Sequence, residues 1–187
     1  MKNALVERQN ALHSVYLSAV TFGATVRQYD LQFVQRFELP PLTAQGTRPL
    51  QSALICLQDV LSNDLMVATP ERLGDGRPLV FIILAERPDP NWQKAYDALT
   101  HFTDNRQPLV ILVTKYGRLA QEMRVPGISI VSLETTSEAK NNKAPYADRI
   151  ASFFAWVTQA ILDRCDASAR GDATAELPPL PPKLTLM

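Results

Sequence analysis

The sequence holds few cysteines, no long apolar run and no excess of charge. Its two cysteines, Cys56 and Cys165, form no CxxC or Cys/His cluster, which argues against a zinc site and against a disulfide-bonded secreted scaffold. No run approaches the roughly 20 apolar residues of a transmembrane helix, and Met1 leads into a polar segment rather than a signal-peptide core. Nineteen basic side chains balance nineteen acidic ones, so no net field attracts nucleic acid or an anionic membrane. We therefore expect a cytoplasmic protein that binds neither.

The short glycine motifs of nucleotide-binding proteins and hydrolases are also missing. Neither GxGxxG nor GxxxxGK[ST] occurs, so the common phosphate-binding turns are absent. The nucleophile-elbow motif GxSxG is absent too, and the two histidines, His13 and His101, lie far from any serine motif. These absences disfavour the commonest routes to an enzyme.

What the sequence does contain is enough apolar residues for a core, in an alternating pattern of elements. Its 187 residues, 46% of them hydrophobic, suit one globular domain. The apolar segments 79–85, 109–114 and 128–133 are typical of parallel strands covered on both faces, and we expect 79–85 at the centre of the sheet. Helical patterns separate these segments. The sequence therefore predicts an α/β fold, a doubly wound, Rossmann-like and mostly parallel sheet with helices on both faces.

The two ends of the chain carry further elements. Residues 4–12 are predicted as one helix of about three turns, 15–22 as a buried strand, and 24–39 as an edge strand or hairpin arm. Leu50 opens an amphipathic helical pattern, for which Thr47 is the predicted N-cap. We divide the chain into a domain over 1–163 and a proline-rich tail over 164–187, which we expect to lie outside the core.

Acidic residues follow the predicted strands at the edge where doubly wound sheets bind ligands. Glu86, Asp89 and Glu134 lie there, and carboxylates are ligands that Mg²⁺ prefers. Solvated loop carboxylates explain them equally well, and no paired general base or hydroxyl-rich loop accompanies them. Metal binding by this cluster is therefore disfavoured.

Four segments occur in order along the chain: VYLSAVTF, LPPLTAQGTRPLQSALICL, GDGRPLVFIILAERPDPNW and APYADRIASFFAWV. Together they resemble the von Willebrand factor A-type domains of bacterial tellurite-resistance proteins, over roughly residues 1–163. The resemblance implies a Rossmann-like domain with a metal-ion-dependent adhesion site at the carboxyl edge of its sheet. In that family the site takes an Asp-x-Ser-x-Ser loop, a threonine and an aspartate.

The same resemblance implies that most of this adhesion site is lost here. Thr47, preceded by Gly46, stands where the threonine falls, but Ala85 occupies the aspartate's position and the Asp-x-Ser-x-Ser loop is absent. Glu86 is expected to point to the opposite side of its strand. Because one hydroxyl does not compensate the dehydration of a divalent cation, we expect binding around Gly46, Thr47, Ala85, Glu86 and Asp89 without a metal or other cofactor.

In that family the absent first strand lies between the strands corresponding to residues 15–22 and 79–85. Its loss leaves two rows of unpaired backbone groups, and we expect direct pairing of the flanking strands or self-association to satisfy them. A strand donated by a partner and a start upstream of Met1 are the alternatives.

The expected function is a non-catalytic protein-interaction module, binding another protein in a stress-resistance complex. An enzyme is the rival interpretation: a Mg²⁺-dependent phosphatase or nucleotide hydrolase using Glu86, Asp89 or Glu134. A structural subunit without a ligand is the third.

Overall fold

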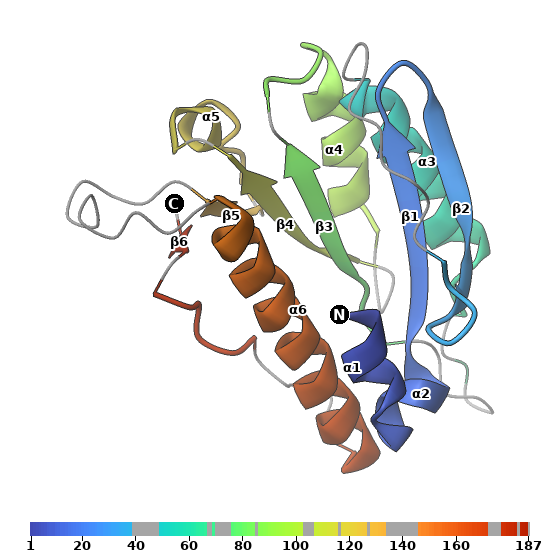
Figure 1. Ribbon diagram of the computed structural model, residues 1–187. Coiled ribbons are helices and arrows are strands. Elements are labelled where there is room, and N and C mark those ends of the chain that lie inside the picture. Colours follow the sequence, from blue (N-terminus) through green and yellow to red (C-terminus); the bar gives the residue numbers. More distant parts are fainter. Residues whose placement is uncertain are drawn as a thin grey trace.

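The computed structural model describes residues 1–38, 49–66, 69, 76–84, 86–102, 107–115, 117–126, 128–133, 146–171, 177–182 and 184–186. Within them the helices are α1 (Lys2–Val6), α2 (Gln9–Ser14), α3 (Leu50–Asn63), α4 (Trp92–Thr100), α5 (Gly117–Glu122) and α6 (Tyr146–Ala169). The strands are β1 (Tyr16–Phe22), β2 (Val26–Phe33), β3 (Leu79–Leu84), β4 (Leu109–Thr114), β5 (Ser129–Ser132) and β6 (Thr185–Leu186). Figure 1 shows their arrangement.

The strands form two separate sheets. The larger has the order β3-β4-β5-β6, in which β3, β4 and β5 are parallel and β6 pairs antiparallel with β5. The smaller is the antiparallel hairpin β1-β2, which confirms the prediction of a hairpin arm after residue 23. The three apolar runs therefore form parallel strands as predicted, and the α/β fold class is confirmed.

Helices cover both faces of the larger sheet (Figure 1). On one face, a core formed by α3, α4 and α5 packs against the β3 side chains of Ile82 and Leu84. On the opposite face α6 supplies Phe153, which packs with Phe81 of β3 and Ile111 of β4. Continuous apolar strands form here because both faces of each strand meet a helix.

In the described part of the chain, no helix combines the length and apolar character needed to cross a bilayer.

The prediction of one helix over residues 4–12 is wrong. The backbone is extended at Arg8, with φ −105° and ψ 118°, and separates α1 from α2. Leu5 and Ala11 are both fully buried in the same cluster beneath α6. Six residues at about 100° each would put these side chains on different sides of a continuous helix, so the break allows both to be buried.

The prediction that residues 79–85 form the centre of the sheet is also wrong. Over the described residues β3 pairs only with β4 and β1 only with β2, so both are edge strands. The expected direct pairing between segments 15–22 and 79–85 is therefore not observed. Nor is β1 a buried strand, because Tyr16 is exposed and its other side chains are only half-buried.

The tail does not lie outside the core. Helix α6 continues past Arg164 to Ala169, so the predicted boundary at residue 164 falls inside a helix. The Trp156 indole Nε1 donates a hydrogen bond to the Pro178 carbonyl oxygen at 2.9 Å. Leu184 is 6% exposed and packs in the α6 core, just before β6 joins the sheet. Apolar residues between the prolines thus give this segment a place in the fold.

A buried tyrosine in the core predicts a loss of stability at high pH. Burial, with the nearby charge of Asp97 as a second cause, raises the pKa of Tyr96 to about 12. An unfolded tyrosine ionises near pH 10, so this group's contribution is complete below about pH 10 and is lost as the pH rises toward 12. Ultraviolet titration of wild type and Tyr96→Phe is expected to show one phenol ionising late, near pH 12. A difference titrating near pH 10 instead would contradict this.

Candidate functional site

Three of the five predicted site residues, Gly46, Thr47 and Ala85, lie outside the described residues, as does Glu134. Glu86 is exposed and already engaged in an interaction. Asp89 is half-buried. Among the described residues, no group of three or more His, Cys, Asp or Glu side chains lies close enough to share a metal ion.

Asp89 acts as a helix cap supplied from a distant part of the chain. Its Oδ1 accepts hydrogen bonds from the N–H groups of Leu50, at 3.0 Å, and Gln51, at 3.4 Å. Pro49 occupies the N-cap position of α3 and offers no side-chain cap, so the prediction of Thr47 as N-cap is wrong. A carboxylate at this end of a helix satisfies free N–H groups and complements the helix dipole. The geometry assigns Asp89 a structural role.

Replacing Asp89 with alanine is expected to lower the free energy of unfolding by about 1 kcal/mol, because two N–H groups at the start of α3 lose their acceptor. Urea denaturation measures the change. Asp59→Ala, at an exposed position in the middle of the same helix, is the matched control and is expected to change stability by less than about 0.5 kcal/mol. Equal effects of the two substitutions would contradict the capping role.

The carboxyl edge of the sheet carries two further kinds of polar group. Glu122 of α5 pairs with Arg118 at 3.1 Å and with Arg87 at 3.7 Å, and both arginines are largely exposed. Such ion pairs are screened by water and contribute little to stability. Thr114 and Ser132, at the ends of β4 and β5, are fully buried and engaged in interactions of their own. These groups do not converge on one point.

Cys165 does not have the surroundings of a reactive thiol. Both Cys56 and Cys165 are free and half-buried. Burial raises the pKa of the Cys165 thiol, and Asp166 adds to the increase. The thiolate is the nucleophilic form, so a raised pKa disfavours reactivity.

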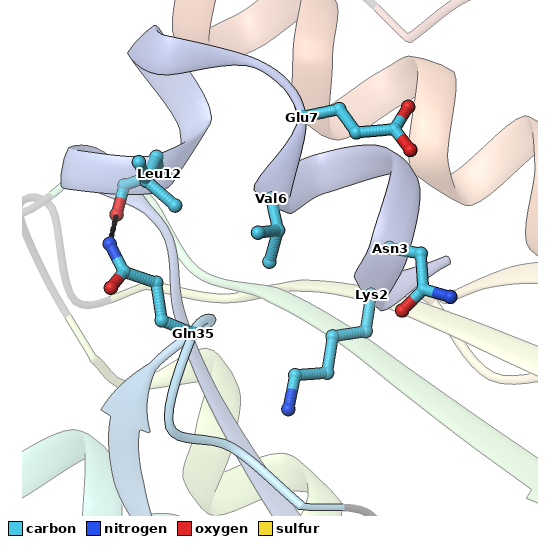
Figure 2. Close-up of a pocket in the computed structure, with 6 residues that line it drawn as sticks. All are labelled: Lys2, Asn3, Val6, Glu7, Leu12 and Gln35. Carbon is cyan, nitrogen blue, oxygen red and sulfur yellow. Dashed lines mark hydrogen bonds between the residues drawn. The ribbon is translucent and has the colours of Figure 1, made fainter.

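An open depression of about 590 Å³ lies between the N-terminal helices and the segment after β2. Its lining residues are Lys2, Asn3, Val6, Glu7, Leu12 and Gln35. Figure 2 shows the charged ends of Lys2 and Glu7 pointing in different directions, while the Gln35 amide reaches the Leu12 carbonyl oxygen at 3.4 Å. Because its polar groups diverge, we assign no binding site to this depression.

The outer edge of β3 is the strongest candidate for binding. The Leu109 N–H donates to the Pro78 carbonyl oxygen, and the Lys115 N–H donates to the Leu84 carbonyl oxygen. These two bonds determine which residues of β3 direct their backbone groups toward β4 and which direct them away from it. The backbone groups of residues 80, 82 and 84 therefore face β4, and those of 79, 81 and 83 face the open side. The Ile83 side chain is 41% exposed, whereas Val113, opposite it on β4, is completely buried. Among the described residues no strand pairs with this apolar edge.

A second open edge belongs to β1. The bond from the Gly23 N–H to the Thr25 oxygen, at 3.2 Å, fixes the hydrogen-bonding alternation of the hairpin. It directs the backbone groups of Val20 and Phe22 away from β2. Figure 1 shows β1 and β3 pointing toward the same end of the molecule.

The same helix layers cover both open edges. Helix α3 contacts β1 and packs on α4, and Phe22 of β1 joins the core that contains Leu84 of β3. On the opposite face α6 packs against Phe81 of β3. Its Ile161 packs against the cluster of Leu5, Ala11, Val15 and Val34, against which Leu17 of β1 also packs. Among the described residues, neither outer edge pairs with another strand. We use the name β1–β3 opening for these two outer edges taken together.

No family model, no curated protein and no solved structure matches this chain.

The sequence predicts the apolar strand at residues 79–85, but it places this strand at the centre of the sheet instead of at an edge. The signal was present in the segment LVFIIL, which is apolar throughout, as a strand with two neighbours would be. Which backbone groups are free depends on the register with β4, which only the structure supplies. No local sequence pattern indicates the capping role of Asp89. The N–H groups that it accepts from belong to Leu50 and Gln51, which precede it by 39 and 38 positions in the chain.

Proposed function

We propose that this chain is a non-catalytic protein-binding module whose binding surface is the β1–β3 opening. The observation that carries the proposal is the outer edge of β3. In the part of the chain that the structure describes, no strand pairs with this apolar edge, and its Ile83 is half-exposed. Natural proteins protect such edges with charges, prolines or bulges, because an exposed apolar edge pairs with other chains. Leu79–Leu84 carries none of these protections, which favours a surface meant to be covered.

We further propose that the fold is von Willebrand A-like and that binding needs no bridging ion. The resemblance of the four sequence segments supports the first part, and the place of the module in a stress-resistance complex rests on it alone. The capping role of Asp89 supports the second, because this carboxylate is already committed to α3. The function is therefore mediated by backbone pairing rather than by a metal.

Affinity capture from the host cells tests this function, using the tagged wild type and two proline variants. Ile83→Pro removes an N–H group that faces the opening. Gln28→Pro removes one that faces outward on the far edge of β2, by the same hairpin alternation, and is the matched control. We expect a partner to be retained by the wild type and by Gln28→Pro, with or without EDTA, and to be lost with Ile83→Pro. Equal retention by Ile83→Pro, or release by EDTA, would contradict the proposal.

A further inference from the structure

The proline-rich segment after α6 packs beside that helix in a regular pattern. Figure 1 shows it returning along α6 toward β5. Leu177 and Leu180 pack against the core cluster that contains Trp156, whereas Pro179 and Pro182 are exposed. Packed and exposed residues thus each recur after three positions. Because the polyproline II helix has three residues per turn, this pattern places one side of such a helix on the core and another side in solvent.

A hydrogen bond from α6 fixes the segment on this face. The Trp156 indole Nε1 donates to the Pro178 carbonyl oxygen at 2.9 Å, and Trp156 is 6% exposed. A polyproline II segment has no internal hydrogen bonds, so its carbonyl oxygens are available to an outside donor. Proline-rich ligands dock on aromatic surfaces, and an indole adds a donor to its apolar ring. The contact therefore has the chemistry of peptide recognition, here within a single chain.

The segment is attached less firmly than the core beneath it. Its four prolines, at positions 178, 179, 181 and 182, carry no N–H group and donate nothing to the fold. Leu177 and Leu180 are only half-buried. Segments with few hydrogen bonds and incompletely buried side chains open at a lower free energy than the surrounding core. An external segment with the same pattern can therefore exchange with this one.

The exchange is confined to the proline-rich part of the segment. Leu184 is buried in the α6 core, and β6 pairs with β5, so both hold the following residues in place. A second copy of this chain gains nothing by the exchange, because each copy brings one segment and one site, and the same contacts already form within each chain without the cost of association. A different protein gains whatever further contacts it makes.

We propose that this face of α6 is a docking site for a proline-rich segment of a partner protein that carries two leucines three residues apart, and that residues 177–182 occupy the site as an intramolecular competitor. The partner segment places both leucines on the core and a carbonyl oxygen on the Trp156 indole. The competitor lowers the affinity for the partner without abolishing it. This site goes beyond the β1–β3 opening, because β6 lies at the opposite edge of the sheet from β3.

Two fluorescent peptides of identical composition test this proposal on the full chain. The first, LPPLPPK, repeats the chain's own sequence, and the second, LLPPPPK, makes the leucines adjacent, so that they point to different sides. The double variant Leu177→Ser/Leu180→Ser weakens the competitor. Fluorescence anisotropy is expected to show saturable binding of the first peptide to the double variant. At least about tenfold weaker binding is expected for the wild type, and likewise for the second peptide.

Trp156→Phe, added to the double variant, tests the hydrogen bond. It is expected to weaken binding of the first peptide by about fivefold, because the carbonyl oxygen loses its donor while most of the apolar ring remains. Trp92→Phe makes the same change in the core on the other face of the sheet and is expected to retain the affinity of the double variant. Circular dichroism verifies that each variant is folded.

Four results would overturn the proposal: no saturable binding to the folded double variant, equal binding of the two peptides, equal affinity of the wild type and the double variant, or no effect of Trp156→Phe. If the double variant does not fold, the wild type replaces it at higher peptide concentration, where only the first peptide is expected to bind. A wild-type dimer in light scattering that the double variant loses would assign the site to a second copy and also overturn the proposal. The capture experiment at residue 83 is independent of all these results.

Discussion

Replacing Phe153 with alanine is expected to lower the free energy of unfolding by about 3–5 kcal/mol. The Phe153 side chain is fully buried, and its ring lies 5.7 Å from that of Phe81 and 6.0 Å from that of Trp156, centroid to centroid. Removing it leaves a cavity where α6 meets β3, and cavity formation adds to the lost transfer free energy. Urea denaturation, followed by far-ultraviolet circular dichroism, measures the change.

Phe154→Ala is the control for this substitution. Phe154 is next in the chain and also touches Phe153, at 5.5 Å between ring centroids, but its side chain is only half-buried. We expect a clearly smaller loss, because less apolar surface returns to water. A loss below about 1 kcal/mol for Phe153→Ala would show that α6 does not hold the sheet as described.

Proline at two adjacent positions of β3 is expected to have opposite consequences. Ile82→Pro removes an N–H group that faces β4 and truncates a buried side chain, so we expect a loss of about 3 kcal/mol or more. Ile83→Pro removes an N–H group that faces the β1–β3 opening, where a strand edge tolerates proline, and is expected to cost about 1 kcal/mol or less. Chemical denaturation of the two variants gives both values.

This pair of variants tests the register of β3 independently of any partner. Both substitutions introduce the same residue one position apart, so differences in proline content or chain entropy cancel. If Ile83→Pro were as destabilising as Ile82→Pro, the outer edge of β3 would already be paired in the isolated chain. The proposal of an open binding edge would then be wrong.

Much of the fold follows from local sequence patterns. The segments of β3, β4 and β5 are apolar throughout, and α3 and α4 show helical spacing of apolar residues, so short windows suffice to predict them. What the windows miss depends on contacts between distant residues. The break at Arg8 follows from burying Leu5 and Ala11 together, and the folded tail depends on Trp156 reaching Pro178, 22 residues away.

The candidate site was less predictable than the fold. Direct pairing of segments 15–22 and 79–85, or self-association, is the expectation from the sequence, but β1 and β3 do not pair with each other among the described residues. Helix α3 contacts β1 and β2, and its Leu54 belongs to the same core cluster as Ile82 and Leu84 of β3, so this helix connects the two sheets without pairing their strands. Packing between helices and sheets is a tertiary property, and neither strand's sequence reports it.

Amide hydrogen exchange along β3, resolved by residue with nuclear magnetic resonance, tests the open edge most directly. In the isolated chain the N–H groups of Val80 and Ile82, which bond to β4, are expected to exchange at least about 100-fold more slowly than those of Phe81 and Ile83. Equal protection of all four groups in the isolated chain would contradict the account, because it would mean that the edge of β3 is already covered.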